Sequence, residues 1–344
     1  MSLSRPVTFP IVKLPFLCME SIIKNWKIVD IVFFALISKK TRQIVKHLKI
    51  PLNRIEISLS DHRYIELGIW LRKWGFWNES RWESHSEWYK YRTKRYPLVL
   101  QKNAIPVHTS KFNDFLDSYS DENAFIVLKM AMEFLNEVFK CSVETVRIED
   151  DNFPESGEIG VKSTVNLYIN GNRSQSYGYA QSQKLSSLLE HLEVTGTCNF
   201  WMDSTEKDFY VDPKLFKCKK LEFGTDSAAW VTREILLQFE VAQLVFSDCS
   251  FSVEDILAFV TNWFHSDNKK LEYLHIINLR TQFSLDDFRT TDFSWRNLPS
   301  TTGDIYFPER LEIVHHDGSI GIIDAKGVHF VFSVCIKKPA ITQH

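Results

Sequence analysis

The most constraining feature of this sequence is an uninterrupted apolar run at residues 31–37, inside a stretch that reads as three short helices. Leu14-Pro15 opens the first helix, because proline suits a first helical turn. Asp30 lies in the first turn of the second, where a carboxylate complements the helix dipole, and Ser38 can cap the third. A helical unit of about 40 residues cannot bury such a run by itself. We therefore expect part of it to face another domain or another protein.

The overall composition narrows the class of protein. A length of 344 residues predicts two compact units, or a small and a large one. The net charge of −2 provides no basic field that would attract nucleic acid or an anionic membrane. The six cysteines include no C-x-x-C pair, which indicates buried thiols in a reducing compartment. No signal peptide begins the sequence, and the longest apolar run is far shorter than the roughly 20 residues that cross a bilayer. We expect a cytoplasmic or nuclear protein.

The first fifty residues resemble the F-box. The resemblance is carried by FP at 9–10, LP at 14–15, MESII at 19–23 and SKKTR at 38–42. These motifs are most similar to those of the large F-box family expanded in nematodes. The F-box binds the Skp adaptor of a cullin-RING ubiquitin ligase. The resemblance implies these Skp-adaptor-binding or module-core residues: Leu14, Pro15, Leu17, Ile22, Ile23 and Leu36.

Two positions depart from the F-box pattern. Trp26 stands where a smaller Leu or Met is usual, and Thr41 stands where many F-boxes have tryptophan. The second departure is common in the nematode subfamily. The alternative interpretation is an ordinary amino-terminal helical subdomain that packs on its own protein.

The middle of the chain begins with an aromatic and basic segment, 63–96. It holds five tryptophans: Trp70, Trp74, Trp77, Trp82 and Trp88. The first three of them would share one face of a helix. Such a mixture can stack on bases, but without a basic field we favour a packing or partner-contact segment. An amphipathic helix is predicted at 121–140 and a strand at 143–148. Asn170-Gly171 predicts a β-hairpin over 161–179.

The carboxyl-terminal half repeats a short strand, a turn and a helix. KKLEF at 219–223 recurs as KKLEY at 269–273, with another strand candidate at 243–246 between them. Ser252 begins a capping-box variant before a helix with an apolar stripe. The pattern resembles a degenerate leucine-rich repeat, necessarily short and capped. Near the end, Asp317-Gly318 predicts a tight turn between strands, and 328–336 a further strand.

A second family resemblance lies in the same half. AWVTRE at 229–234, SVEDI at 252–256, FVTNW at 259–263 and KLEYL at 270–274 follow one another as in the type 2 F-box-associated domain. That domain follows the F-box in the same nematode family. The match covers about residues 200–276. It implies a target-binding role, and it implies neither catalytic residues nor a ligand motif.

No motif for nucleotide, metal or nucleophile chemistry was found in the sequence. His315-His316-Asp317 and His265-x-Asp267 are the metal-like clusters, and we interpret both as turn residues because zinc needs four convergent ligands. Cys18 is interpreted as a small hydrophobe and not as a ligase cysteine. We expect no catalytic residue, no metal and no cofactor.

Together these observations predict an α+β chain. A small three-helix F-box is followed by a mixed α/β domain with leucine-rich-repeat-like strand–helix units and a carboxyl-terminal β-hairpin. The expected segments are 8–50, 51–199, 200–276 and 277–344. The predicted function is a substrate-recognition adaptor. Its expected partners are the Skp adaptor, through it a cullin, and an unidentified target, with no nucleic acid and no membrane. The alternatives are an F-box scaffold that acts outside a ligase and, least favoured, an enzyme.

Overall fold

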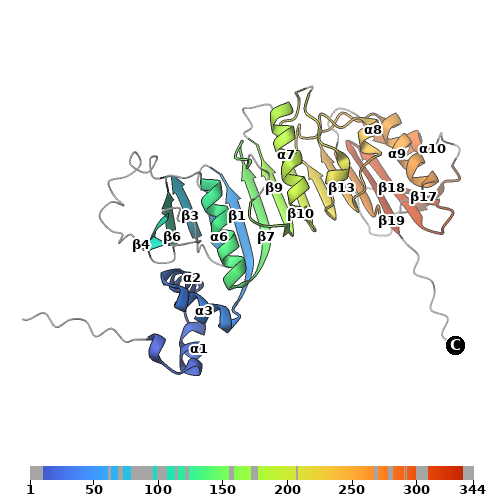
Figure 1. The fold of residues 1–344 in the computed structure, drawn as a ribbon. Coiled ribbons are helices and arrows are strands. Elements are labelled where there is room, and N and C mark those ends of the chain that lie inside the picture. Colours follow the sequence, from blue (N-terminus) through green and yellow to red (C-terminus); the bar gives the residue numbers. More distant parts are fainter. Residues whose placement is uncertain are drawn as a thin grey trace, which may run out of the picture. The chain divides into compact units, whose positions relative to one another are not determined.

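The computed structural model describes residues 11–60, 63–68, 73–78, 96–98, 107–112, 115–120, 124–154, 159–171, 177–206, 208–266, 270–277, 282–289, 291, 293–299 and 309–335. They form two units. Figure 1 shows the fold of the chain. Unit 1 comprises 1–145 with 159–161, and unit 2 comprises 146–158 with 162–344. The predicted mixed class is confirmed, since helices within residues 16–48 precede mixed β-sheet with further helices. The four expected segments remain a prediction.

The three predicted amino-terminal helices are confirmed. After the short 3-10 helix η1 (Ile11–Lys13) come α1 (Phe16–Lys24), α2 (Ile28–Ile37) and α3 (Lys39–Leu48). Pro15 is the N-cap of α1, and Asp30 lies in the first turn of α2. Ser38 caps α3 reciprocally: its Oγ accepts from the Thr41 backbone N–H at 3.2 Å, and the Thr41 Oγ1 accepts from the Ser38 N–H at 3.0 Å. The cap explains why threonine suits position 41.

The apolar helix α2 is covered by unit 1 itself. Its residues Ile31, Val32, Phe34, Ala35 and Leu36 are buried, while Phe33 is half-buried. They pack against α3 and against β6 (Phe115–Ser120). Trp26 also closes on the helix, with its ring edge-on to Phe34 at 5.4 Å. The sheet of unit 1 and α3 therefore cover most of the run, as its apolar character requires, whereas Ile37 at its end is 60% exposed.

Six strands of the sheet lie wholly within the described part of unit 1. They are β1 (Pro51–Leu59), β2 (Arg63–Leu67), β3 (Lys73–Asn78), β4 (Tyr96–Leu98), β5 (Val107–Phe112) and β6. β1–β2, β2–β3, β4–β5 and β5–β6 are antiparallel pairs, while β3 pairs with β6 in parallel. The predicted helix is α6 (Ala124–Val138), which packs on β2 and β3. The predicted strand is β7 (Lys140–Glu149), which also pairs with β1.

Part of the tryptophan-rich segment forms a β-strand. Residues 73–78 form β3, so the helical face expected for the tryptophans is wrong there. Trp74 is fully buried, and its indole N–H donates to the Ser118 Oγ at 2.8 Å. This residue therefore packs in the core, as the packing interpretation requires. Trp70, Trp82 and Trp88 lie outside the described residues.

Unit 2 is built on a ladder of parallel strands. β9 (Asn166–Asn170), β11 (Thr197–Trp201), β12 (Lys220–Phe223), β13 (Gln243–Ser247) and β14 (Tyr273–Ile277) lie side by side in chain order (Figure 1). The register places Phe223 opposite both Phe200 and Phe246. The Phe223 and Phe246 rings stack at 5.1 Å. Like side chains therefore repeat at one level of the core, as in a solenoid.

Helical segments connect the parallel strands. They are α7 (Tyr179–His191) after β9, η2 (Pro213–Leu215) after β11, α8 (Arg233–Leu236) after β12 and α9 (Val253–His265) after β13. Ser252 caps α9 reciprocally with Asp255, which confirms the predicted capping box. A short parallel pair, β8 (Ser163–Thr164) with β10 (Glu193–Val194), accompanies the ladder.

Two details of the predicted repeat differ in the structure. Over the described residues, Asn170-Gly171 makes no hairpin: β9 instead pairs in parallel with β11, and the Gly171 N–H donates to the Trp201 carbonyl at 2.7 Å. The KKLE match is also out of register, because Leu221 aligns through Leu244 with Leu274 and not with Leu271. Leu271 is buried ahead of β14. Local sequence likeness is a weaker determinant of register than the alternation of buried side chains.

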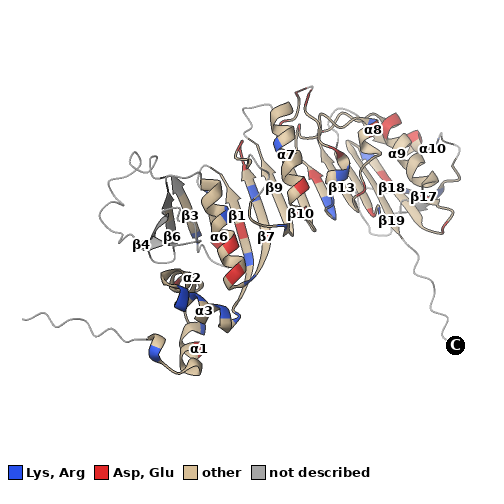
Figure 2. Ribbon diagram, viewed as in Figure 1, with Lys and Arg blue, Asp and Glu red and all other residues tan. Residues whose placement is uncertain are grey.

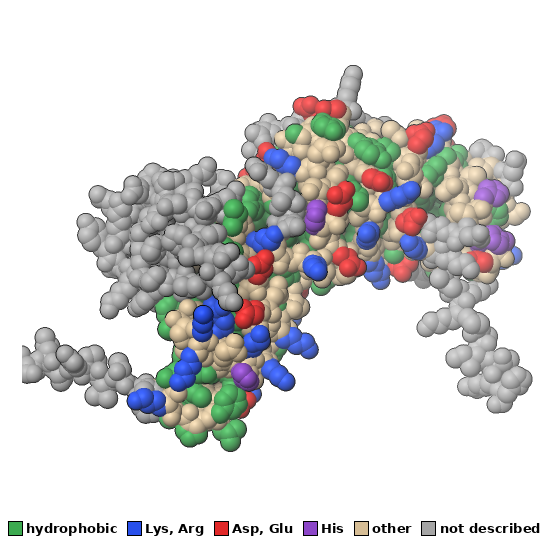
Figure 3. Space-filling view, viewed as in Figure 1, with side chains coloured by type: hydrophobic (Ala, Val, Ile, Leu, Met, Phe, Trp, Pro, Cys, Tyr) green, Lys and Arg blue, Asp and Glu red, His purple; other side chains and the backbone are tan. Residues whose placement is uncertain are grey.

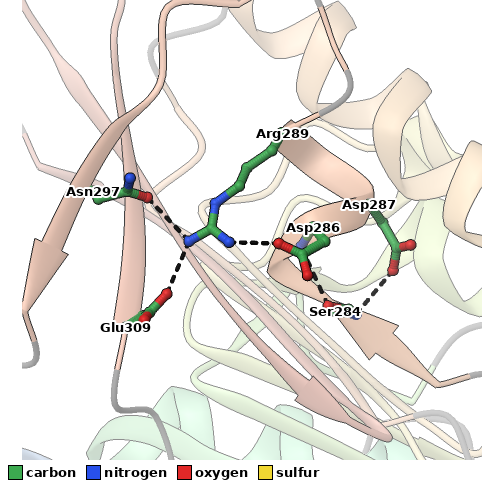
Figure 4. A network of polar contacts seen from close by, with 6 residues as sticks. All are labelled: Ser284, Asp286, Asp287, Arg289, Asn297 and Glu309. Carbon is green, nitrogen blue, oxygen red and sulfur yellow. Dashed lines mark hydrogen bonds and ion pairs between the residues drawn. The ribbon is translucent and has the colours of Figure 1, made fainter.

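Antiparallel strands end the ladder. β14 pairs with β19 (His329–Cys335), which pairs with β18 (Ile320–Gly327), then β17 (Glu309–Val314) and β16 (Arg296–Pro299). The predicted Asp317-Gly318 turn is confirmed, with Gly318 at φ +86°. β15 (Phe283–Ser284) pairs with β18 and leads into α10 (Leu285–Arg289). At the end of α10, Arg289 contacts Asp286, Asn297 and Glu309 (Figure 4).

The phenylalanine ladder predicts a large and local stability effect. Phe223→Ala removes a fully buried ring that touches five others, so we expect a loss of about 3–5 kcal/mol of unfolding free energy. Tyr179→Ala is the matched control, since that ring is 60% exposed, and we expect a change below about 0.5 kcal/mol. Urea titration followed by fluorescence measures both. Equal effects would contradict the ladder as the core of unit 2.

Candidate functional site

The first candidate site is an apolar face on α1. Leu17 is 76% exposed, Phe16 44% and Ile22 38%, while Met19 and Ile23 on the other side of the helix are buried. Figure 3 shows hydrophobic side chains gathered over this helix. We call the exposed residues the α1 surface; they are Pro15, Phe16, Leu17, Cys18 and Ile22.

The α1 surface leaves large apolar side chains exposed to solvent. Exposed apolar area costs about 25 cal/mol per Å² relative to burial, and contiguous apolar patches mark interaction sites. Lysines border it, with Lys13 and Lys24 exposed near its two ends. Lys24 is held by Glu20 at 2.6 Å. The α1 surface is therefore suited to a partner with an apolar groove.

The predicted site residues divide into two groups. Leu17, Ile22 and Pro15 are exposed, and Leu14 beside them is half-buried. Ile23 and Leu36 are buried inside unit 1, at 0% and 4% exposure. Those two hold the module together and cannot face a partner without rearrangement.

Sequence reasoning missed two members of the α1 surface. It left Phe16 out and placed Cys18 among apolar neighbours, whereas the structure exposes both. The helical spacing from Cys18 to Ile22 is the signal that could have placed the thiol on the exposed side. The Phe9-Pro10 pair lies outside the described residues.

The second candidate site is the polar face of the ladder in unit 2. Side chains alternate along each strand, so those that do not enter the core point to the opposite face. Across the strands they form a row of half-buried residues: Tyr168, Asn199, Glu222, Val245 and His275. The Arg147 guanidinium lies over the Tyr168 ring at 4.6 Å. Charged residues of both signs lie on the strands around β13 (Figure 2). Such a face provides hydrogen bonds and charge for protein recognition.

Residues 214–276 match a family model described as F-box associated. The matched segment runs from η2 through β12, α8, β13 and α9 to β14, which is the greater part of the ladder. It falls inside the region expected at 200–276. No curated protein and no solved structure matches the chain.

The polar clusters of unit 2 have structural roles. His315 is buried and its Nδ1 lies 2.7 Å from an Asp317 carboxyl oxygen. Hydrogen bonds from the Ser319 side chain and backbone, and the one with His315, hold the pKa of Asp317 well below its usual range. This cluster shapes the turn, as predicted for His315-His316-Asp317. Asp267 of the other cluster lies outside the described residues.

Two classes of site can be assessed over the described part of the chain. No three His, Cys, Asp or Glu side chains there are placed to hold a metal ion. No helix there is both long and apolar enough to cross a membrane.

The cysteines are not uniformly buried, which corrects the sequence expectation. Cys18 and Cys335 are exposed. Burial raises the pKa of the Cys141 and Cys249 thiols to about 12. A hydrogen bond with Cys218, together with burial, also raises the pKa of Cys198. Thiols with raised pKa values remain protonated at neutral pH and are poor nucleophiles.

Thiol labelling therefore has a definite expected pattern. With a disulfide reagent at pH 7.5, we expect Cys18 and Cys335 of the native chain to react fast. The three buried thiols, Cys198, Cys218 and Cys249, should react at least about a hundredfold more slowly, because they need local opening. Absorbance stopped-flow with peptide mass mapping measures this, and the denatured chain supplies the reference of six thiols. A slow Cys18 would show that the α1 surface is covered in solution.

Proposed function

We propose that this chain is a non-catalytic adaptor, in which α1–α3 form an F-box that docks on the Skp adaptor and unit 2 recognises a target. The observation that carries the proposal is the α1 surface. Unit 1 buries α2 and the inner side of α1, yet leaves Leu17 and Ile22 in water. A helix whose apolar side faces solvent gains stability when a partner covers it, by about 1.5–3 kcal/mol for each large side chain fully buried.

The matched segment supports the second half of the proposal. A domain described as F-box associated, at residues 214–276, is expected behind an F-box. Its parallel ladder gives unit 2 a rigid polar face, and stacked repeats present such surfaces for binding proteins. In this arrangement the ligase partners carry out ubiquitin transfer, and the chain contributes proximity by holding a target near the conjugating enzyme. A cytoplasmic or nuclear location belongs to the same proposal.

Charge substitution on the α1 surface tests the docking half. We expect Leu17→Asp with Ile22→Asp to weaken binding to purified Skp adaptor by at least about a hundredfold, since two buried carboxylates would lack partners. Both sites are exposed, so the fold should persist. Calorimetry measures the affinity and circular dichroism the fold.

Ile126→Asp is the matched control. Ile126 is 44% exposed on α6, away from the α1 surface in sequence, and we expect its substitution to leave adaptor affinity within about twofold. Failure of the unaltered chain to bind the Skp adaptor would remove the F-box assignment. If a cullin does not join the bound pair, the chain is a scaffold outside a ligase.

Cys18 gives a second, independent test. We expect the Skp adaptor to slow labelling of Cys18 by at least about tenfold, because the thiol lies on the α1 surface. Cys335 is exposed in unit 2 and serves as the internal control, with an unchanged rate. Equal protection of both thiols, or of neither, would contradict docking through α1.

A further inference from the structure

A basic pocket lies in unit 2, within the matched segment. Its volume is about 400 Å³, and it is lined by Lys214, Phe216, Lys217, Glu240 and Lys270. All five residues belong to the segment at 214–276. Three lysines against one glutamate give the lining a net charge of +2. The site could not be predicted from the sequence, because its charged residues come from three separate stretches of chain.

The segment that carries two of these lysines is held in place. The Asp212 carboxylate caps η2 by accepting from the Lys214 N–H at 3.0 Å, and the Phe216 N–H donates to the Pro213 carbonyl at 3.2 Å. The Phe216 ring is buried against Phe223 and Phe239, with centroid distances of 6.3 and 5.9 Å. Lys214 and Lys217 flank this anchored ring at a spacing of three residues. The pocket is therefore organised before any ligand arrives.

Neighbouring lysines have carboxylate partners. Lys220 pairs with Glu222 at 2.8 Å and Lys219 with Glu272 at 3.8 Å. Over the described residues, neither Lys214 nor Lys217 has a carboxylate within 4.0 Å. Two ammonium groups that line one pocket without a carboxylate partner repel each other, and an anion in the pocket offsets that repulsion.

The pairing of Glu240 with Lys270 indicates that the pocket suits an oxyanion. The Glu240 carboxylate lies 3.0 Å from the Lys270 Nζ, so the lining already accommodates one oxyanion of its own. The pocket volume of about 400 Å³ is large enough for a second oxyanion, and Lys214 and Lys217 are the lining cations without a carboxylate partner in the described part of the chain. Carboxylate and phosphate share the chemistry that ammonium groups recognise.

We infer that this pocket binds an acidic side chain, carboxylate or phosphate, on a peptide segment of the target. The inference rests on the proposed role of unit 2 in target recognition. Charge complementarity favours this ligand, because the lysines attract an anionic segment. The Glu240 carboxylate repels additional negative charge in the pocket.

Three labelled octapeptides test the inference with the full chain: (Gly-Glu)4, (Gly-phosphoserine)4 and (Gly-Gln)4. Fluorescence anisotropy at low salt measures their affinities without any Skp adaptor. We expect at least one anionic peptide to bind at least about tenfold more tightly than (Gly-Gln)4. The stronger of the two identifies carboxylate or phosphate as the source. Because the adaptor is absent, failure of α1 docking leaves this measurement unchanged.

Substitutions of opposite sign locate the binding. We expect Lys214→Gln with Lys217→Gln to weaken the anionic peptide by about tenfold, and Glu240→Gln to strengthen it by about threefold. Lys39→Gln with Lys40→Gln removes the same charge from exposed positions in unit 1 and should change affinity by less than about twofold.

Three results would each overturn the inference. They are anionic peptides that bind no better than (Gly-Gln)4, an equal loss in the unit 1 control pair, and weaker binding after Glu240→Gln. Lysine acetylation footprinting adds a check of place, because the bound peptide should protect Lys214 and Lys217 and leave Lys39 and Lys40 reactive. The reverse pattern would also overturn it.

Discussion

Burial of α2 is the interaction on which the amino-terminal site depends. Because β6 and α3 cover the buried residues of α2, this helix has little surface to offer a partner and becomes the fixed support of the module. Helix α1 follows a different rule: Met19 and Ile23 anchor it, and its remaining apolar residues have no cover among the described residues. The sheet therefore decides that α2 is buried while part of the apolar surface of α1 stays exposed.

In unit 2 the corresponding constraint is register. Cys198, Leu221, Leu244 and Leu274 occupy one level of the core, and the next level is aromatic or branched throughout. A shift of one residue in any of these strands would reverse its faces, and in β12 it would place Lys220 and Glu222 in the core. The same register fixes the polar face and holds η2 against the ladder through the ring of Phe216. The polar face and the position of η2 therefore both depend on how the core of this unit is stacked.

Local signals in the sequence predicted local structure well. The Ser38 and Ser252 caps, the three short helices and the Asp317-Gly318 turn each depend on a few adjacent residues, and each was found as predicted. Pairing between distant strands was less accessible. Asn170-Gly171 has the composition of a tight turn, but parallel hydrogen bonds to Trp201 override that preference. The exposure of Leu17 and the burial of Leu36 likewise depend on which helix the sheet covers. That packing involves residues far apart in the chain, so local sequence patterns do not predict it.

The antiparallel strand β19 has a consequence for how copies of this chain meet. A parallel ladder exposes backbone N–H and C=O groups along its last strand, and another ladder could add there and extend the stack indefinitely. Here β19 lies against β14 in the opposite direction and uses those groups, with Leu274 opposite Phe332 and Ile276 opposite Phe330. The parallel stack therefore ends at β14, and β19 offers no free edge to another repeat because β18 pairs with its other side.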